Sequence, residues 1–312
     1  MQVYKPQGVY AAMMTPLDDR REPLEASLRA YTDLCIGGGI QGLFPVSSVG
    51  EFVHFSLNQK KRIIDIVCDQ SNGRLPVVPG AADTNPDRCI ELAAHAQSRG
   101  CSAVVVCPPY FYPLDDDRIE RHFRKLAAGV PDMPIILYNI PMFTSPISHE
   151  VIARLSHVPN IIGLKDSSGS MIDLMNFMDR VRLEEANFTV LTGREETFVP
   201  ALMGGAQGCM VVISGIVPEF MSTLYRLWQR QHVDAALMLQ YELLGLVRDM
   251  AALPFPVGFK LALESRGIPM GPFLQPVPQD DPSQRAADRS RIGKRVQRLL
   301  TISQKAKEVD LS

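Results

Sequence analysis

Short apolar runs rich in β-branched residues recur eight times before residue 214, and amphipathic helical patterns alternate with them. The runs are 9–14, 42–46, 76–80, 103–107, 134–138, 161–165, 189–192 and 208–213. Apolar residues at three- and four-residue spacing fill most of the intervals, at 57–69, 87–98, 117–128, 149–156 and 172–182. This alternation predicts an α/β fold, specifically a (β/α)8 TIM barrel rather than an open doubly wound sheet.

The strand pattern stops after Trp228, and the remaining patterns are helical, at 234–253, 259–265 and 285–307. We therefore expect a TIM-barrel catalytic domain over 1–228 and a C-terminal helical domain over 229–312. Prolines concentrate between the last two helical patterns, which predicts a stiff linker. The glycine clusters at 37–39 and 204–205 follow helical patterns and precede strands, so we interpret them as helix terminators rather than phosphate-binding loops.

Composition and charge exclude several classes of function. A formal net charge of −2 provides no basic surface for nucleic acid or for anionic membranes. Residues 1–8 contain no basic segment followed by an apolar stretch, and no apolar run reaches the length of a membrane span, so we expect a cytoplasmic protein with no membrane partner. Six cysteines without a CxxC pair and six dispersed histidines predict no disulfide framework, no metal site and no cofactor, although the fold could still assemble ligands.

One lysine stands where packing gives no reason for a charge. Lys165 closes the apolar run 161–164 at the carboxyl end of a predicted strand, and catalytic groups of TIM barrels lie at such ends. A desolvated lysine amine is a nucleophile that can form a Schiff base with a carbonyl. The alternative is a solvated charge at the rim of the barrel. Lys260, in a helical pattern, we interpret as structural.

Other strand ends supply groups that fit the same chemistry. The turn Ser48–Gly50 offers amides and a hydroxyl to a carboxylate, and Tyr138 offers a phenol for proton transfer. A 2-oxo acid bound there would condense with Lys165, and the imine would accept electrons from the bond between C3 and C4. Each group also has a structural alternative, because a tyrosine can cap a core and acidic residues can complement a helix dipole. Further candidates for substrate binding are Ser47, Val49, Phe111, Tyr112, Phe143, Gly193, Glu195, Glu196 and Ser214.

Three segments carry a family resemblance. Ser47-Ser48-Val49-Gly50-Glu51, Tyr138-Asn139-Ile140-Pro141 and Gly163-Leu164-Lys165-Asp166, in this order, resemble the dihydrodipicolinate synthase/N-acetylneuraminate lyase superfamily. The resemblance covers nearly the whole chain and implies a TIM barrel with a C-terminal helical domain, a homotetramer, and Schiff-base chemistry on pyruvate or a longer 2-oxo acid. It further implies that Lys165 forms the imine, that Tyr138 is the catalytic phenol, and that Ser48, Val49 and Gly50 bind the carboxylate.

Departures from the family pattern indicate which branch of the superfamily this chain resembles. The resemblance implies a second threonine where this chain has Val49, a relay tyrosine where it has Phe111 with Tyr112 adjacent, and a carboxylate-binding arginine where it has Phe143. An apolar ring cannot pair with a carboxylate. Gly50-Glu51-Phe52 and Leu164-Lys165-Asp166 resemble the sugar-acid branch of the family. The resemblance also aligns Glu195 and Glu196 with acidic residues that contact substrate hydroxyls in the sialic acid lyases.

We therefore expect a class I pyruvate-dependent aldolase or lyase that cleaves a 2-oxo-3-deoxy acid to pyruvate and an aldehyde. The alternatives are a dihydrodipicolinate synthase that condenses pyruvate with aspartate semialdehyde, a dehydratase using the same imine, and a catalytically weak barrel that serves as a scaffold.

Overall fold

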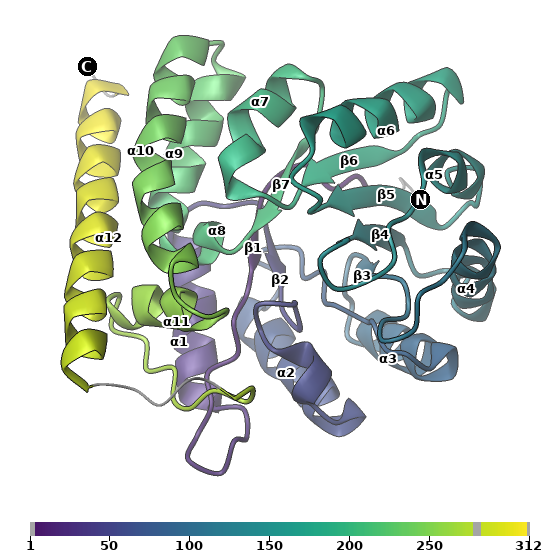
Figure 1. Cartoon of the computed structure of the whole chain (residues 1–312), viewed down its shortest axis with the longest axis horizontal. Coiled ribbons are helices and arrows are strands. Elements are labelled where there is room, and N and C mark those ends of the chain that lie inside the picture. The colour runs from purple at the N-terminus through teal and green to yellow at the C-terminus, as the bar shows by residue number, and fades with distance from the viewer. Residues whose placement is uncertain (1–3, 277–281, 311–312) are drawn as a thin grey trace. The chain divides into compact units, whose positions relative to one another are not determined.

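The computed structural model describes residues 4–276 and 282–310, and the chain divides into two compact units. Unit 1 comprises Met1–Gly8 and Pro76–Met210, and unit 2 comprises Val9–Leu75 and Val211–Ser312. Figure 1 gives the labels of the helices and strands along the chain. Strands and helices alternate up to β7 as the sequence pattern predicts, except that no strand is assigned between residues 71 and 86, where two helices follow one another.

Unit 1 contains five parallel strands that pair in the order β7-β6-β5-β4-β3. They are β3 (Val104–Val106), β4 (Ile135–Asn139), β5 (Ile161–Asp166), β6 (Thr189–Thr192) and β7 (Gly208–Val211). Every residue of these strands is buried, and strands covered on both faces have continuous apolar sequences rather than alternating ones. This burial explains why the sequence pattern located them.

Helices connect these strands, as parallel pairing requires. They are α3 (Pro86–Ser98), α4 (Asp116–Gly129), α5 (His149–Leu155), α6 (Met171–Leu183) and α7 (Phe198–Met203), with a 3-10 turn η2 (Glu195–Thr197). Four of them begin at a side chain that accepts a hydrogen bond from the first turn, namely Asn85, Asp115, Ser148 and Ser170. Such caps each contribute about 1 kcal/mol and fix where the helix begins.

The third predicted strand is not a strand in the structure. Residues 76–80 form an extended segment with isolated bridge residues at Val77 and Gly80, and Gly80 pairs with Val105 of β3. The Val105 amide donates to the Pro79 carbonyl at 2.9 Å. Pro76 and Pro79 have no N–H to donate, so this segment cannot form a continuous ladder. The prediction of eight strands is therefore wrong by one within residues 4–276 and 282–310, where seven are assigned.

Unit 2 begins with two parallel strands and the helices that follow them. β1 (Gly8–Ala12) pairs with β2 (Gly42–Phe44), and Tyr10 lies opposite Gly42. A Cβ at Gly42 would lie 2.1 Å from the Tyr10 ring, so only glycine allows this strand pair. The connecting helices are α1 (Glu25–Gly37) and α2 (Leu57–Ser71), with a 3-10 turn η1 (Phe52–His54) between β2 and α2.

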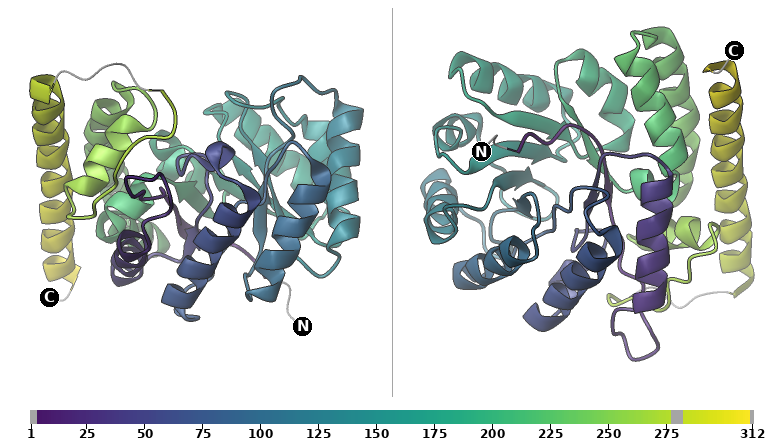
Figure 2. Two further views of the ribbon diagram at one scale, coloured as in Figure 1. Left: turned by 90° about the horizontal axis from the view of Figure 1, so that it is seen from below. Right: turned by 180° about the vertical axis from the view of Figure 1, so that it is seen from behind.

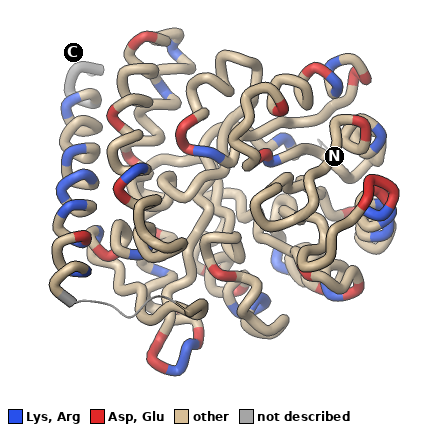
Figure 3. Tube along the Cα trace, viewed as in Figure 1, with Lys and Arg blue, Asp and Glu red and all other residues tan. Residues whose placement is uncertain are grey.

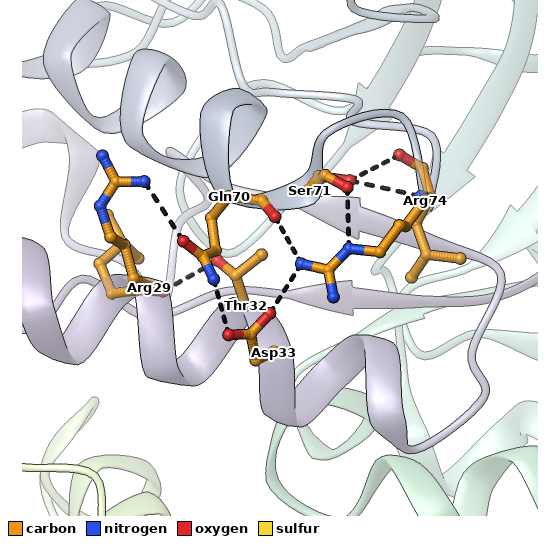
Figure 4. Close-up of polar contacts among 8 residues, drawn as sticks. Arg29, Thr32, Asp33, Gln70, Ser71 and Arg74 are labelled. Carbon is orange, nitrogen blue, oxygen red and sulfur yellow. Dashed lines mark hydrogen bonds and ion pairs between the residues drawn. The ribbon is translucent and has the colours of Figure 1, made fainter.

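A polar network links α1 to α2 (Figure 4). Asp33 accepts from Arg74 Nη2 at 2.7 Å and from Gln70 Nε2 at 2.6 Å, and Arg29 Nη1 donates to Gln70 at 3.3 Å. Arg74 and Asp33 are about half exposed, so solvent weakens their ion pair. The network orients the two helices, and the buried apolar faces of α1 and α2 stabilise their packing.

The predicted glycine terminators end helices in the structure. α1 ends at Gly37 with Gly38 as its C-cap, and α7 ends at Met203 with Gly204 as its C-cap. Gly39 and Gly205 follow with positive φ angles, which glycine adopts at little cost. The prediction that these clusters terminate helices is confirmed.

The C-terminal part of unit 2 is helical: α8 (Ile213–Ile216), α9 (Pro218–Gln229), α10 (Val233–Ala251), α11 (Val257–Glu264) and α12 (Pro282–Asp310). α9, α10 and α12 run side by side (Figures 1 and 2). α12 buries Ile292, Val296 and Leu299 along one face, and Lys and Arg are spread along its length (Figure 3). The three predicted helices are confirmed to within three residues. Residues 277–281 of the predicted linker lie outside the described residues, and the domain boundary after residue 228 stays a prediction.

Candidate active site

Lys165 and Tyr138 lie together on neighbouring buried strands of unit 1. Tyr138 belongs to β4 and Lys165 to β5, and the parallel register pairs the two residues directly. Lys165 Nζ lies 4.1 Å from the centroid of the Tyr138 ring. The residues are only 2% and 5% exposed, so bulk water is excluded from both. Strand pairing thus brings an amine and a phenol together in a dry environment, as their positions at strand ends predicted.

Hydrogen bonds hold the ends of the same two strands in place. Asn139 Nδ2 donates to Asp166 Oδ1 at 2.7 Å, and Asn139 Oδ1 accepts from the Ile147 amide at 3.0 Å. Ser168 Oγ donates to Asp166 Oδ2 at 2.7 Å. Burial raises the pKa of Asp166 above its usual value, and the hydrogen bonds from Ser168 and Asn139 oppose that shift. The network keeps Tyr138 and Lys165, one residue upstream, in fixed register.

Ser167 also belongs to this group, although the sequence analysis did not single it out. Its Oγ lies 3.5 Å from Tyr138 Oη and donates to the Gly193 carbonyl at 3.3 Å. Gly193, which the sequence did predict, follows β6, and its amide donates to the Asp166 carbonyl at 2.6 Å. A Cβ at position 193 would lie 2.0 Å from Ser167 Oγ and 2.7 Å from Lys165 Cε. The absence of a side chain at Gly193 therefore makes room for the amine and the hydroxyl.

The remaining candidates of unit 1 differ in exposure. Glu195 is buried. Glu196 forms an ion pair with Arg194 at 3.2 Å. The other carboxylate oxygen of Glu196, Oε2, is buried and has no hydrogen-bond partner among the described residues. Phe111 and Tyr112 are 85% and 74% exposed, so these rings do not belong to the core. Phe143 is also exposed. In addition, Phe111 has a φ of +89°, which is a strained conformation for a residue with a large side chain.

The serine turn belongs to unit 2 and follows β2. Ser47 Oγ donates to the Met13 carbonyl at 2.8 Å, and the Gly50 amide donates to the Ser47 carbonyl at 3.0 Å. The Ser47 hydroxyl therefore holds the turn to the chain that follows β1. Ser48 at the next position is half-buried, and Val49 is buried. A Cβ at Gly50 would lie 2.9 Å from the Met13 carbonyl oxygen, so this close approach of backbone requires glycine.

Four further observations concern the described residues. Ser214 is fully buried in α8, and its hydroxyl has no hydrogen-bond partner among them. All six cysteines are free thiols. Within residues 4–276 and 282–310, no cluster of three His, Cys, Asp or Glu side chains has the arrangement of a metal site, and no helix combines the length and apolarity that crossing a bilayer requires.

Comparison with known families identifies the chain. The model of the Dihydrodipicolinate synthetase family matches residues 5–292, which is nearly the whole sequence. The chain belongs to this family. At this level it is a lyase or aldolase, and the resemblance inferred from its three motifs is confirmed.

Curated relatives and solved structures agree with that assignment. The 4-hydroxy-tetrahydrodipicolinate synthase of Methanothrix thermoacetophila is 32% identical to this chain, over 87% of it and 90% of the relative. An uncharacterized DapA-like lyase of Thermococcus onnurineus is also 32% identical, over 86% and 92%. YagE, a prophage protein of the dihydrodipicolinic acid synthase family from E. coli K12 solved with pyruvate, has a TM-score of 0.85 and 27% identity, over 93% and 98%.

The synthase of Methylacidiphilum fumariolicum SolV has a TM-score of 0.88 and 25% identity, over 97% of this chain and 99% of its own. These matches extend over both units and the C-terminal helices. The fold is therefore the α/β fold of this family, with parallel strands alternating with helices and further helices at the C-terminus.

Proposed function

We propose that this protein is an imine-forming lyase that cleaves a 2-oxo-3-deoxy acid to pyruvate and an aldehyde. Lys165 is the nucleophile, Tyr138 transfers the proton, and the turn Ser48–Gly50 binds the carboxylate of the 2-oxo acid. The observation that carries the proposal is the burial of the Lys165 amine against the Tyr138 ring on paired strands. The pyruvate complex of YagE supports pyruvate as the small product.

The chemistry follows from these two side chains. The neutral amine of Lys165 attacks the C2 carbonyl, the carbonyl oxygen takes up one proton from the amine and one from solvent and leaves as water, and a protonated imine forms. Tyr138 removes the proton of the C4 hydroxyl, the bond between C3 and C4 breaks, and its electron pair moves through the enamine to the imine nitrogen. The aldehyde departs, the enamine gains a proton at C3, and hydrolysis releases pyruvate and the free amine. Every step uses the substrate, water and protein side chains.

The other candidates from the sequence are assigned roles in substrate binding. Glu195 and Glu196, with Ser47, Val49, Ser214 and Gly193, are our candidates for contacts to a polyhydroxylated substrate, and Phe111, Tyr112 and Phe143 for its distal end. The exposed ring of Phe143 favours an aldehyde without a carboxylate beside it, because an apolar ring offers no hydrogen bond to an anion.

A second candidate is 4-hydroxy-tetrahydrodipicolinate synthase itself, which condenses pyruvate with aspartate semialdehyde. The relatives favour it, since the proteins of Methanothrix thermoacetophila and Methylacidiphilum fumariolicum are named 4-hydroxy-tetrahydrodipicolinate synthases. Phe143 argues against it, at the position where the resemblance implies an arginine.

Parallel assays separate the two candidates. The purified protein is incubated with a panel of 2-oxo-3-deoxy acids, and pyruvate release is followed; a second reaction contains pyruvate and aspartate semialdehyde. The proposal predicts pyruvate release from at least one sugar acid, faster than the condensation. Condensation alone would establish the second candidate, and a Lys165→Met variant inactive in both assays serves as the control.

We further propose the finer features of the fold and the assembly. A closed (β/α)-barrel, in which the extended segment 76–80 takes the place of a strand through its bridge to β3, agrees with the parallel pairing of the assigned strands and with the structural relatives. The family resemblance implies a homotetramer, and a cytoplasmic location is the expectation drawn from the sequence pattern. Light scattering of the purified protein tests the assembly.

A further inference from the structure

A buried ion pair adjoins the serine turn within unit 2. Lys260 Nζ lies 2.6 Å from Glu51 Oε2, and the two side chains are 1% and 3% exposed. Glu51 is the last residue of the motif Ser47–Glu51, whereas Lys260 lies on α11, 209 residues further along the chain. The pair thus connects the turn to the C-terminal helices of the same unit.

The remaining polar atoms of the pair bind a single segment of backbone. Glu51 Oε1 accepts from the amides of Leu274 and Gln275, at 2.9 and 3.3 Å. Lys260 Nζ donates to the Pro272 carbonyl at 2.9 Å and lies 4.9 Å from the centroid of the Phe273 ring. The segment 272–275, the helix α11 and the turn are therefore held by one cluster of charge-assisted bonds.

The backbone of the turn requires such support. Val46 and Glu51, on either side of Ser47–Gly50, have φ angles of +56° and +59°. Side chains with a Cβ disfavour this left-handed conformation, and it persists only where surrounding contacts fix it. Ser47 is fixed through Met13, and Glu51 is fixed through Lys260 and the amides of 274 and 275.

Fold stability alone is a poor explanation for the pair. Removing two charges from water costs much of what their attraction returns, and apolar residues of similar volume often serve as well. Burial lowers the pKa of Lys260, and the charge of Glu51 opposes that shift. The bonds of the Glu51–Lys260 pair are directional. The pair can therefore fix the backbone of the strained turn beside it, and this accounts for keeping two charges out of water.

We propose that Glu51 and Lys260 are positioning residues that hold the turn Ser48–Gly50 in the conformation that receives the substrate carboxylate. This inference depends on the proposed function, in which that turn binds the carboxylate of pyruvate. Neither residue touches the substrate. They act by keeping the backbone amides of the turn aligned, and so they affect carboxylate recognition rather than imine chemistry.

Two variants test the proposal. Glu51→Gln keeps an acceptor for the amides of Leu274 and Gln275 and removes the negative charge. The double variant Glu51→Gln, Lys260→Met removes both charges, so that no unpaired charge is buried. Arg266→Met is the matched control, because it breaks the partly buried Arg266–Glu219 pair of 2.7 Å in the same unit. Circular dichroism shows whether each variant folds.

The measurement is borohydride trapping of the imine at increasing concentrations of pyruvate or of methyl pyruvate, the neutral ester. For the variants we expect the half-saturating concentration of pyruvate to rise about tenfold, as for a displaced binding group. The value for methyl pyruvate and the maximal trapping rate should stay near those of the wild type, and Arg266→Met should change neither.

Three results would overturn the inference: equal rises for both ligands, no rise in the folded double variant, or loss of fold in both variants, which would make the pair a support of the fold. Absence of any pyruvate adduct on the wild-type protein would instead refute the proposed function. The two failures are therefore distinguishable.

Discussion

Replacing Gly193 by alanine tests whether the space beside Lys165 is needed. The new Cβ would lie 2.0 Å from Ser167 Oγ and 2.7 Å from Lys165 Cε, whereas real Cβ contacts are longer than 3.0 Å. Ser167 Oγ must therefore move by about 1 Å and Lys165 Cε by a few tenths of an ångström. Misplacing a reacting group by about 1 Å costs on the order of 100-fold in rate, so the smaller shift of the Lys165 amine should cost on the order of tenfold, or about 1.4 kcal/mol of transition-state stabilisation.

The assay compares lyase turnover and borohydride trapping of pyruvate in Gly193→Ala and the wild type. We expect both rates to fall about tenfold while the variant remains folded, because the closest clashes are with side-chain atoms. Gly37→Ala is the control: a Cβ there meets nothing within 4 Å, so both rates should be unchanged. Wild-type rates in Gly193→Ala would refute the claim that this space positions the amine.

Three further predictions concern single side chains. Tyr138→Phe keeps the ring against Lys165 and removes the hydroxyl, so turnover should fall by about 10²–10⁴-fold while imine trapping persists; equal turnover would exclude proton transfer by the phenol. Phe143→Arg should raise condensation with aspartate semialdehyde at least about tenfold, measured against the wild type. Burial, and to a lesser extent the charge of Lys125, lower the pKa of His122 from 6.5 to about 4. The unfolded chain therefore binds this proton at higher pH than the folded chain, and from pH 6.5 to 4 the free energy of unfolding should fall by about 3 kcal/mol through this group. Urea titrations of His122→Leu should lack that part of the acid loss, and an unchanged pH profile would contradict the assignment.

The sequence predicts much of the fold because its strands are buried on both faces and so appear as continuous apolar runs. The run 76–80 has the same apolar character, but Pro76 and Pro79 lack the amides that a ladder needs. These prolines were a signal in the sequence against a regular strand, and the apolar character of the run concealed it. Helix ends were predictable to a few residues, because capping side chains and glycines set them locally.

Only part of the candidate site could be predicted from the sequence. Lys165 and Tyr138 could be predicted because strand ends in parallel α/β folds converge. Ser167 follows the strand, and its contact with Gly193 depends on how the β5 and β6 exits lie in space. The sequence did contain a signal for Lys260, because a lysine within the apolar helix α11 needs a buried partner. Only the structure identifies that partner as Glu51, which lies far away in the sequence.

The most direct test of the account is to reduce a mixture of the protein and pyruvate with borohydride and to locate the adduct by peptide mass spectrometry. The buried amine against the Tyr138 ring predicts one stable adduct, on the peptide that contains Lys165, and none in Lys165→Met. No adduct, or an adduct on Lys260 instead, would contradict the assignment of the nucleophile and with it the proposed lyase.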